Sequence, residues 1–213
     1  MRSNTQGSLF PGAVLRAADF PGGPPLGAEV CGIDEAGRGP LAGPVYAAAV
    51  VLPADFPLEL LDDSKALSAK RREVAAPLIM EGALAWGIDW ADPEEIDGLN
   101  ILAASLLAMR RAYGRMVRAL GRAPEAVYVD GNRDPRLGRP SSPVVKGDAL
   151  IPSIMAASIL AKVARDRMME RYDWLYPEYG YAKHKGYPTA AHRAICVALG
   201  PSPIQRMSFN YRR

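Results

Sequence analysis

Short apolar runs alternate with longer periodic stretches along this chain, and the first two short runs lie close together. Residues 30–33 and 45–52 are both apolar and have the length of a strand. The turn between them is rich in glycine at 37–40, so the pair predicts a β-hairpin. Three further runs predict short strands, at residues 83–91, 126–129 and 143–145.

Longer stretches have the period of amphipathic helices. Residues 93–121 carry apolar side chains at alternating steps of three and four, with arginines between them as a solvated face, and Gly121 is a typical stop. Residues 149–171 predict a largely buried helix that starts near Pro152 and carries basic residues, Arg165 among them, on one side of its later half. Two further helices are expected after the N-caps Ser68, with Pro77 as an interruption, and Thr189.

Composition indicates a globular protein with one domain and a small appendage. The chain has 213 residues, of which 49% are hydrophobic and 23% charged. Residues 1–28 are rich in proline and glycine and predict a flexible extension, with order expected near residues 14–20. Cys31 and Cys196 are far apart and are expected to be buried thiols in a reducing compartment. With no apolar run of transmembrane length and no signal core, a cytoplasmic protein is expected.

Charge is spread unevenly. The net charge is +3, but residues 160–213 hold ten Lys and Arg against four Asp and Glu. A basic C-terminal quarter can bind a polyanion, although scattered solvated charges would give the same count. Residues 172–187 add tyrosines and Trp174 among cations, which suits stacking on sugars or bases; the alternative is a satellite hydrophobic cluster, above all for Trp174 and Tyr176. His184 and His192 are expected to be surface residues.

An acidic residue follows each of three predicted strands. Asp34 and Glu35 follow the first strand, Asp130 the fourth and Asp148 the fifth. A single acid after a strand is usually a turn residue, but three such ends can lie side by side along one edge of a sheet and bind a hard cation there. The glycines at 37 and 39 would allow close backbone approach to a phosphate or a sugar hydroxyl.

Six motifs occur in an order that resembles the ribonuclease HII family, the type 2 ribonuclease H of bacteria. They are DEAGRGPLAGPV, DDSKALS, VDGN, VKGD, SIMAASILAKVARDR and HKGYPT. The resemblance covers residues 29–209. It implies an α/β ribonuclease H-like fold, a mixed five-stranded sheet flanked by helices. Residues 29–213 would form the catalytic domain, with a helical, substrate-binding C-terminal extension from about residue 167.

The resemblance also implies an activity. Such an enzyme hydrolyses the RNA strand of RNA–DNA hybrids and incises 5′ of single ribonucleotides in duplex DNA, leaving a 3′-hydroxyl and a 5′-phosphate. It serves ribonucleotide removal and genome maintenance. Its cofactors would be two divalent metal ions, Mg²⁺ or Mn²⁺, which favour in-line displacement at a phosphodiester. Its partner would be nucleic acid, with no membrane association, and it would be a monomer.

Site residues are implied position by position. The metal-binding and catalytic carboxylates would be the four acids Asp34, Glu35, Asp130 and Asp148, with Asp34 bridging both ions. Gly37, Arg38 and Gly39 would read the ribose 2′-hydroxyl. Tyr187 would pack on the sugar that follows the ribonucleotide. Lys65 and Lys146 would contact phosphates. Gln205 stands where the family usually has histidine, which puts any role of that imidazole in doubt.

Three other functions stay open. Ribonuclease HIII usually has a sizeable N-terminal domain, which residues 1–28 are too short to form, and its glycine loop usually lacks the arginine. Another two-metal nuclease of the same fold, such as a junction resolvase, would cut DNA without ribonucleotides. A non-catalytic nucleic-acid-binding module would bind without cleavage.

Overall fold

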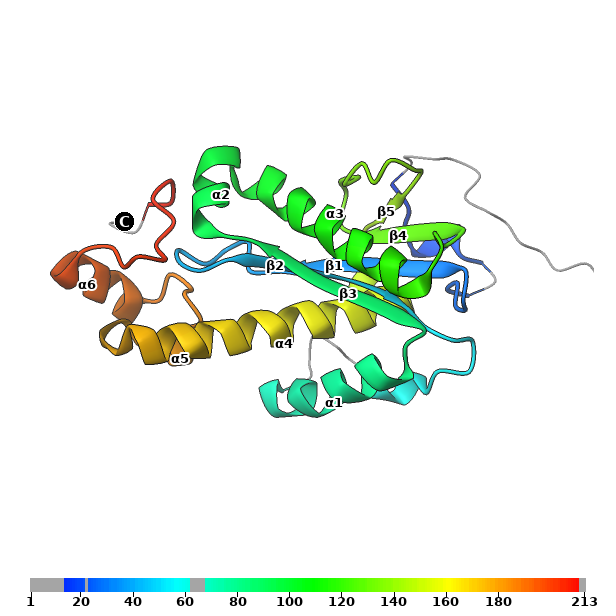
Figure 1. The fold of residues 1–213 in the computed structure, drawn as a ribbon, viewed down its shortest axis with the longest axis horizontal. Helices are drawn as coiled ribbons and strands as arrows, with labels where there is room; N and C mark the ends of the chain where they lie inside the picture. The colour runs from blue at the N-terminus through cyan, green and yellow to red at the C-terminus, as the bar shows by residue number, and fades with distance from the viewer. Residues whose placement is uncertain (1–13, 22, 62–67, 211–213) are drawn as a thin grey trace, which may run out of the picture.

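A mixed sheet of five strands forms the central layer of the computed structural model, which describes residues 14–21, 23–61 and 68–210 (Figure 1). Its order is β3-β2-β1-β4-β5. The strands are β1 (Val30–Ala36), β2 (Val45–Val51), β3 (Ala85–Ala91), β4 (Ala126–Asp130) and β5 (Ser142–Val144). All five correspond to runs that the apolar pattern predicts, so the predicted α/β fold with a mixed sheet is confirmed.

The direction of the strands sets where their ends lie. β1 and β2 are antiparallel with Ala36 opposite Tyr46, which confirms the hairpin. β4 runs parallel to β1, and β5 runs parallel to β4. Strands that run the same way end at the same edge of a sheet. The carboxyl ends of β1, β4 and β5 are therefore neighbours.

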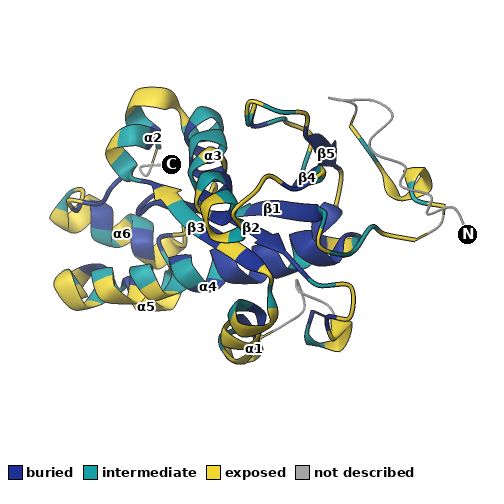
Figure 2. Ribbon diagram, turned by 45° about the vertical axis from the view of Figure 1, so that its right-hand side comes forward, coloured by how far each residue is buried: buried dark blue, intermediate teal, exposed yellow. Residues whose placement is uncertain are grey.

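Helices cover both faces of the sheet. α3 (Ile101–Leu120) packs on one face, and α4 (Pro152–Leu175) packs on the other with α1 (Ala69–Gly82) beside it. Figure 2 shows the buried residues gathered along the strands and the inner side of α4. Gly32 allows α4 to approach closely, because a Cβ there would lie 2.2 Å from the backbone nitrogen of Ile154. This contact places the first turns of α4 against the middle of β1.

Two predictions about helices are wrong. The stretch 93–121 forms two helices, α2 (Pro93–Leu99) and α3, because Asn100 takes a positive φ of 72° and its side chain caps α3. Pro77 does not interrupt α1, which runs through it. Pro77 lies on the exposed face, where water can hydrogen-bond the carbonyl that proline leaves without a donor. The predicted caps Ser68 and Thr189 and the predicted stop at Gly121 are confirmed.

The C-terminal part extends one end of the molecule (Figure 1). After α4 it contains α5 (Tyr181–His184) and α6 (Ala190–Leu199). Trp174 is 81% exposed, so the expectation of a buried cluster is wrong for it, whereas Tyr176 packs against such a cluster. His192 is fully buried and stacks on His184 with ring centres 4.3 Å apart, which contradicts the expectation of two surface histidines.

Two smaller features complete the fold. Leu15 forms an isolated bridge with Val144, and Phe20 packs edge-on against Tyr128, so residues near 14–20 are ordered against the sheet. Cys31 and Cys196 are buried free thiols, as expected. In the part of the chain that the structure describes, no helix has both the length and the apolar character needed to cross a membrane.

Candidate active site

Three carboxylates converge where the parallel strands end. Asp34 lies in β1 and Asp130 ends the neighbouring β4, while Asp148 follows β5 in the short 3-10 helix Gly147–Ala149. One oxygen from each carboxylate lies within 4.8 Å of the others. Asp34 and Asp148 are buried. The parallel arrangement of β1, β4 and β5 thus brings Asp34 next to two carboxylates that lie more than ninety positions further along the sequence.

Backbone amides hold the carboxylates in place. The amide of Glu35 donates to Oδ1 of Asp34 at 2.7 Å, and the amide of Asp148 donates to Oδ1 of Asp130 at 3.2 Å. An N–H that donates to a carboxylate oxygen restricts the orientation of that carboxylate. The orientations of Asp34 and Asp130 are therefore restricted by the protein before any ligand binds.

The electrostatics of these acids fit a divalent cation. Burial raises the pKa of Asp34, and the nearby charges of Glu35 and Asp130 raise it further, against a hydrogen bond from Ser158. Burial also raises the pKa of Glu35, although Arg38, with Nη1 3.5 Å from its Oε1, opposes this. The mutual repulsion of crowded carboxylates is relieved by a bound cation, and hard cations such as Mg²⁺ and Mn²⁺ prefer carboxylate oxygens. The residues present therefore fit such a metal.

All four predicted acids line one pocket of about 400 Å³. Glu35 is outside the group of three that converges most closely, but it shares this pocket with Gly37 and Tyr187. The structure thus brings together six of the ten residues proposed from the sequence. Lys146 is exposed with a φ of 59° and is not among the lining residues, and Lys65 lies outside the described residues.

Three further polar residues line this pocket, and the sequence reasoning missed them. They are Arg72 of α1 and, on α4, Ser158 and Lys162. The spacing of Ser158 and Lys162 is one helical turn, a signal that would have placed both on one face. Lys162 also donates from Nζ to Oδ1 of Asp166 at 2.8 Å.

Tyr187 borders the pocket with its ring half-exposed. The side chain is 40% accessible, and the ring centre lies 5.8 Å from Nζ of Lys162 and 5.7 Å from Cζ of Arg165. Gly39 is beside it, since a Cβ there would lie 3.7 Å from Cε1 of the ring. We call residues 37–44, between β1 and β2, the glycine loop. The tyrosine ring, the two basic side chains of α4 and this loop are thus neighbours, although they come from three distant parts of the chain.

The glycine loop rests on a buried arginine that the sequence analysis put on the basic side of a helix. The side chain of Arg165 is fully buried. Gly37 has a φ of +104°, and a Cβ there would lie only 2.0 Å from Nε of Arg165. Glycine is therefore required at position 37 both by the backbone conformation and by this contact. Gln205, where the family usually has histidine, is buried behind the loop and pairs with Ala42.

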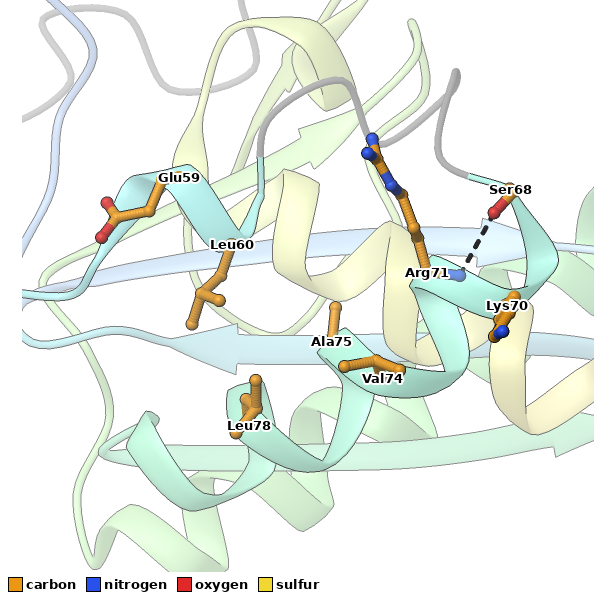
Figure 3. Close-up of a pocket in the computed structure, with 8 residues that line it drawn as sticks. All are labelled: Glu59, Leu60, Ser68, Lys70, Arg71, Val74, Ala75 and Leu78. Carbon is orange, nitrogen blue, oxygen red and sulfur yellow. Dashed lines mark hydrogen bonds between the residues drawn. The ribbon is translucent and has the colours of Figure 1, made fainter.

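A larger pocket, of about 650 Å³, lies beside α1. Figure 3 shows that Leu60, Val74 and Leu78 line it, and that Ser68 accepts a hydrogen bond from the amide of Arg71. None of the four acids lies in this pocket. The chemistry of the side chains, and not the size of the cavity, therefore identifies the smaller pocket as the candidate site.

Comparison with known proteins shows the family to which the chain is similar. A family model described as ribonuclease HII matches residues 31–212. A ribonuclease HII of Laribacter hongkongensis is 59% identical over 183 residues, covering 85% of this chain and 90% of that protein. A ribonuclease HII of Dechloromonas aromatica is 57% identical over 180 residues, covering 84% and 90%. The crystal structure of ribonuclease H2 from Pyrococcus horikoshii OT3 is similar with a TM-score of 0.71 at 26% identity, covering 85% and 94%.

Proposed function

The chain belongs to the ribonuclease HII family of ribonuclease H hydrolases, and from that premise we propose that it incises duplex DNA 5′ of single ribonucleotides besides cutting RNA–DNA hybrids. One observation carries the proposal. The pocket that holds the converging acids is also lined by Gly37 and Tyr187. A site for phosphodiester hydrolysis and a surface suited to a sugar are therefore adjacent.

Asp34, Asp130 and Asp148, together with Glu35, are the proposed catalytic and metal-binding residues. When bound, two divalent ions, Mg²⁺ or Mn²⁺, would supply an activated water and stabilise charge on the leaving oxygen. The contribution of the protein is a set of carboxylates, two of which backbone amides already orient. Cleavage would leave a 3′-hydroxyl and a 5′-phosphate.

The remaining polar side chains are proposed to bind the nucleic acid. Lys162 and Arg72 line the pocket and can contact phosphates next to the reacting one. Lys146 and Lys65 are retained as more distant phosphate contacts. The basic residues of the C-terminal part, from about residue 167, would extend this surface, whereas residues 1–28 stand outside the catalytic domain.

Recognition of the ribonucleotide is proposed to depend on its 2′-hydroxyl, the group that distinguishes RNA from DNA in a duplex. The backbone at Gly37, Arg38 and Gly39 can approach a sugar without obstruction by side chains at the two glycines. The ring of Tyr187 would pack on the next sugar, where a second hydroxyl would crowd it. Discrimination then follows from contacts with two consecutive sugars.

The direct test uses a labelled duplex with one ribonucleotide, an identical all-DNA duplex and an RNA–DNA hybrid, each incubated with Mg²⁺ or Mn²⁺. We expect a single cut 5′ of the ribonucleotide, products with a 3′-hydroxyl, and no cut in the all-DNA duplex. Equal cleavage of the all-DNA duplex, or of a DNA four-way junction, would favour a resolvase-like nuclease. Binding without any cleavage would favour a non-catalytic module. A monomeric state and a cytoplasmic location stay predictions.

A further inference from the structure

The loop between β1 and β2 has an unusual distribution of hydrogen bonds. Arg206 is fully buried and donates from Nε to the carbonyl of Gly43 at 2.8 Å. From Nη1 it donates to the carbonyls of Arg38 at 3.0 Å and Pro40 at 2.8 Å, and from Nη2 to that of Gly37 at 2.6 Å. One side chain near the C-terminus thus binds four carbonyls of a loop near the N-terminus.

Arg165 binds the same loop from α4. It donates from Nε to the carbonyl of Pro44 at 3.1 Å and from Nη2 to that of Ala42 at 3.3 Å. The carbonyl of Leu41 accepts the backbone amide of Arg206 at 2.9 Å. Seven of the eight consecutive carbonyls from 37 to 44 are therefore bound to these two arginines.

Only the carbonyl of Gly39 has no partner among the described residues, and Gly39 is exposed beside the ring of Tyr187. The amides of Gly37, Arg38 and Gly39 also have none within the described part of the chain. A hydroxyl both donates and accepts a hydrogen bond. The groups that this loop leaves available therefore suit a sugar hydroxyl.

The two guanidinium groups also give the loop positive charge. All of their hydrogen bonds go to carbonyls, and no carboxylate forms an ion pair with either of them in the described part of the chain. Burial, with the nearby charge of Arg165, lowers the pKa of Arg206 to about 9, which leaves it protonated at neutral pH. Guanidinium next to amides favours an anionic ligand above the loop.

We propose that Arg206 and Arg165 are positioning residues for ribose recognition. By binding the inward carbonyls, they leave the amides at 37–39 and the carbonyl of Gly39 as the groups presented to a 2′-hydroxyl. This inference rests on the proposed function, and it adds to it the two side chains that set the conformation of the reading loop. Neither arginine lines the pocket, so both act through the backbone.

The test replaces each arginine by lysine, which keeps the charge but lacks the planar set of five donors. R206K and R165K are made in a D130N background, so that binding is measured without cleavage. Dissociation constants are determined at one salt concentration for a duplex with a single ribonucleotide and for the matched all-DNA duplex. R122K is the control, because Arg122 forms an exposed ion pair with Glu29 and does not line the pocket.

We expect R206K to reduce the preference for the ribonucleotide duplex at least tenfold, with affinity for the all-DNA duplex within twofold of the parent. R165K should act in the same direction, and R122K should change neither value. All measurements are made well below the melting temperature of each variant, so that lost stability alone does not change the ratio. If R206K failed to fold, the R165K ratio would decide.

An unchanged preference in R206K or R165K, with only a lower melting temperature, would overturn the inference and leave the proposed function intact. A parent protein that cuts no ribonucleotide duplex and shows no preference for it would instead overturn the proposed function, and this inference with it. The two failures are thus distinguished by the behaviour of the parent protein.

Discussion

Asp34, Asp130 and Asp148 form an acid cluster that borders the same pocket as the glycine loop. The negative charge of the cluster and the positive charge of the arginines that bind the loop are compensated differently. The carboxylates of Asp34 and Asp130 lie close together, and their mutual repulsion raises the pKa of Asp34 in addition to the effect of burial. The guanidinium groups of Arg165 and Arg206 are just as buried, yet backbone carbonyls bind them. Buried charge is costly unless it is paired or hydrogen-bonded.

This difference separates two roles. A cluster that carries unbalanced negative charge is complete only with an added cation, so it gains stability when a metal binds. A loop that two guanidinium groups bind through its carbonyls is held by the protein itself, so it can be rigid before substrate arrives. Replacing residues in each region should therefore have different consequences for activity and for stability.

The largest expected effect comes from the acid cluster. Asp34→Asn keeps the shape of the side chain but removes a charge at the centre of the cluster, so cleavage of the ribonucleotide duplex should fall by about a thousandfold or more. The measurement is the single-turnover rate at saturating enzyme. Asp55→Asn, at an exposed position outside the pocket, should retain the parental rate. A rate near the parental value in Asp34→Asn would show that the proposed metal assignment is wrong.

The glycine loop should respond in both activity and stability. Gly37→Ala forces a Cβ to within 2.0 Å of Nε of Arg165 at a φ of +104°, so we expect a loss of about 2–3 kcal/mol in unfolding free energy and about a hundredfold in kcat/KM. Gly39→Ala is the matched variant, since its Cβ meets only the Tyr187 ring at 3.7 Å. It should fold with nearly parental stability. Denaturant unfolding of both variants, compared with their rates, makes the distinction; equal stability of the two would contradict it.

Tyr187 is expected to affect activity alone. Its ring is 40% exposed, so Tyr187→Ala should change the melting temperature little, whereas loss of packing on a sugar should lower kcat/KM by about ten- to a hundredfold. Tyr187→Phe keeps the ring and should recover most of the rate. A large drop in melting temperature with Tyr187→Ala would instead assign the residue a structural role.

The smallest effect concerns the stability of the metal-free protein. The pKa values of Asp34 and Glu35 are raised in the folded state, so the unfolded chain releases these protons at lower pH than the folded chain does. The two carboxyl groups therefore contribute most to stability below their pKa in the unfolded chain, which is about 4. This contribution declines as pH rises through their higher pKa values in the folded protein. The melting temperature of the metal-free protein should accordingly fall less from pH 5 to 7 in Asp34→Asn than in the parent.

Metal binding should restore the folding stability that the metal-free protein loses as pH rises. Mg²⁺ or Mn²⁺ at a hundred times its dissociation constant would stabilise the folded state by about 2.7 kcal/mol, since a ligand that binds only that state shifts the equilibrium. Melting temperatures at pH 7 with and without metal provide the measurement, and Asp34→Asn is the matched variant that should respond less. An equal response in both proteins would place the metal elsewhere.

Local signals in the sequence were sufficient for much of the fold and for part of the site. Thr189 and Ser68 cap their helices as predicted, because capping depends on the next three residues only. The acids at the ends of β1 and β4 could be paired in advance because parallel strands end together. The pattern predicted one helix across Asn100, because the hydrophobic period continues through it. In the structure Asn100 separates α2 from α3, and its side chain caps α3.

Other features depended on contacts that no local pattern contains. Arginine is rarely buried, so no local pattern predicts the full burial of the side chains at positions 165 and 206. Its carbonyl partner on Pro44 lies 121 positions away, and the partner of Arg206 on Gly37 lies 169 positions away. His192 was expected at the surface for the same reason, although it stacks on His184 in the interior.

The sequence by itself determined the strands, most of the helices, the family and the identity of the acids, because these depend on periodicity, capping and motif residues that are close in the chain. Only the tertiary structure decided that three carboxylates lie within 4.8 Å of one another and that two buried arginines bind the glycine loop. The physical reason is that burial and charge compensation are set by whichever distant groups the folded chain brings into contact.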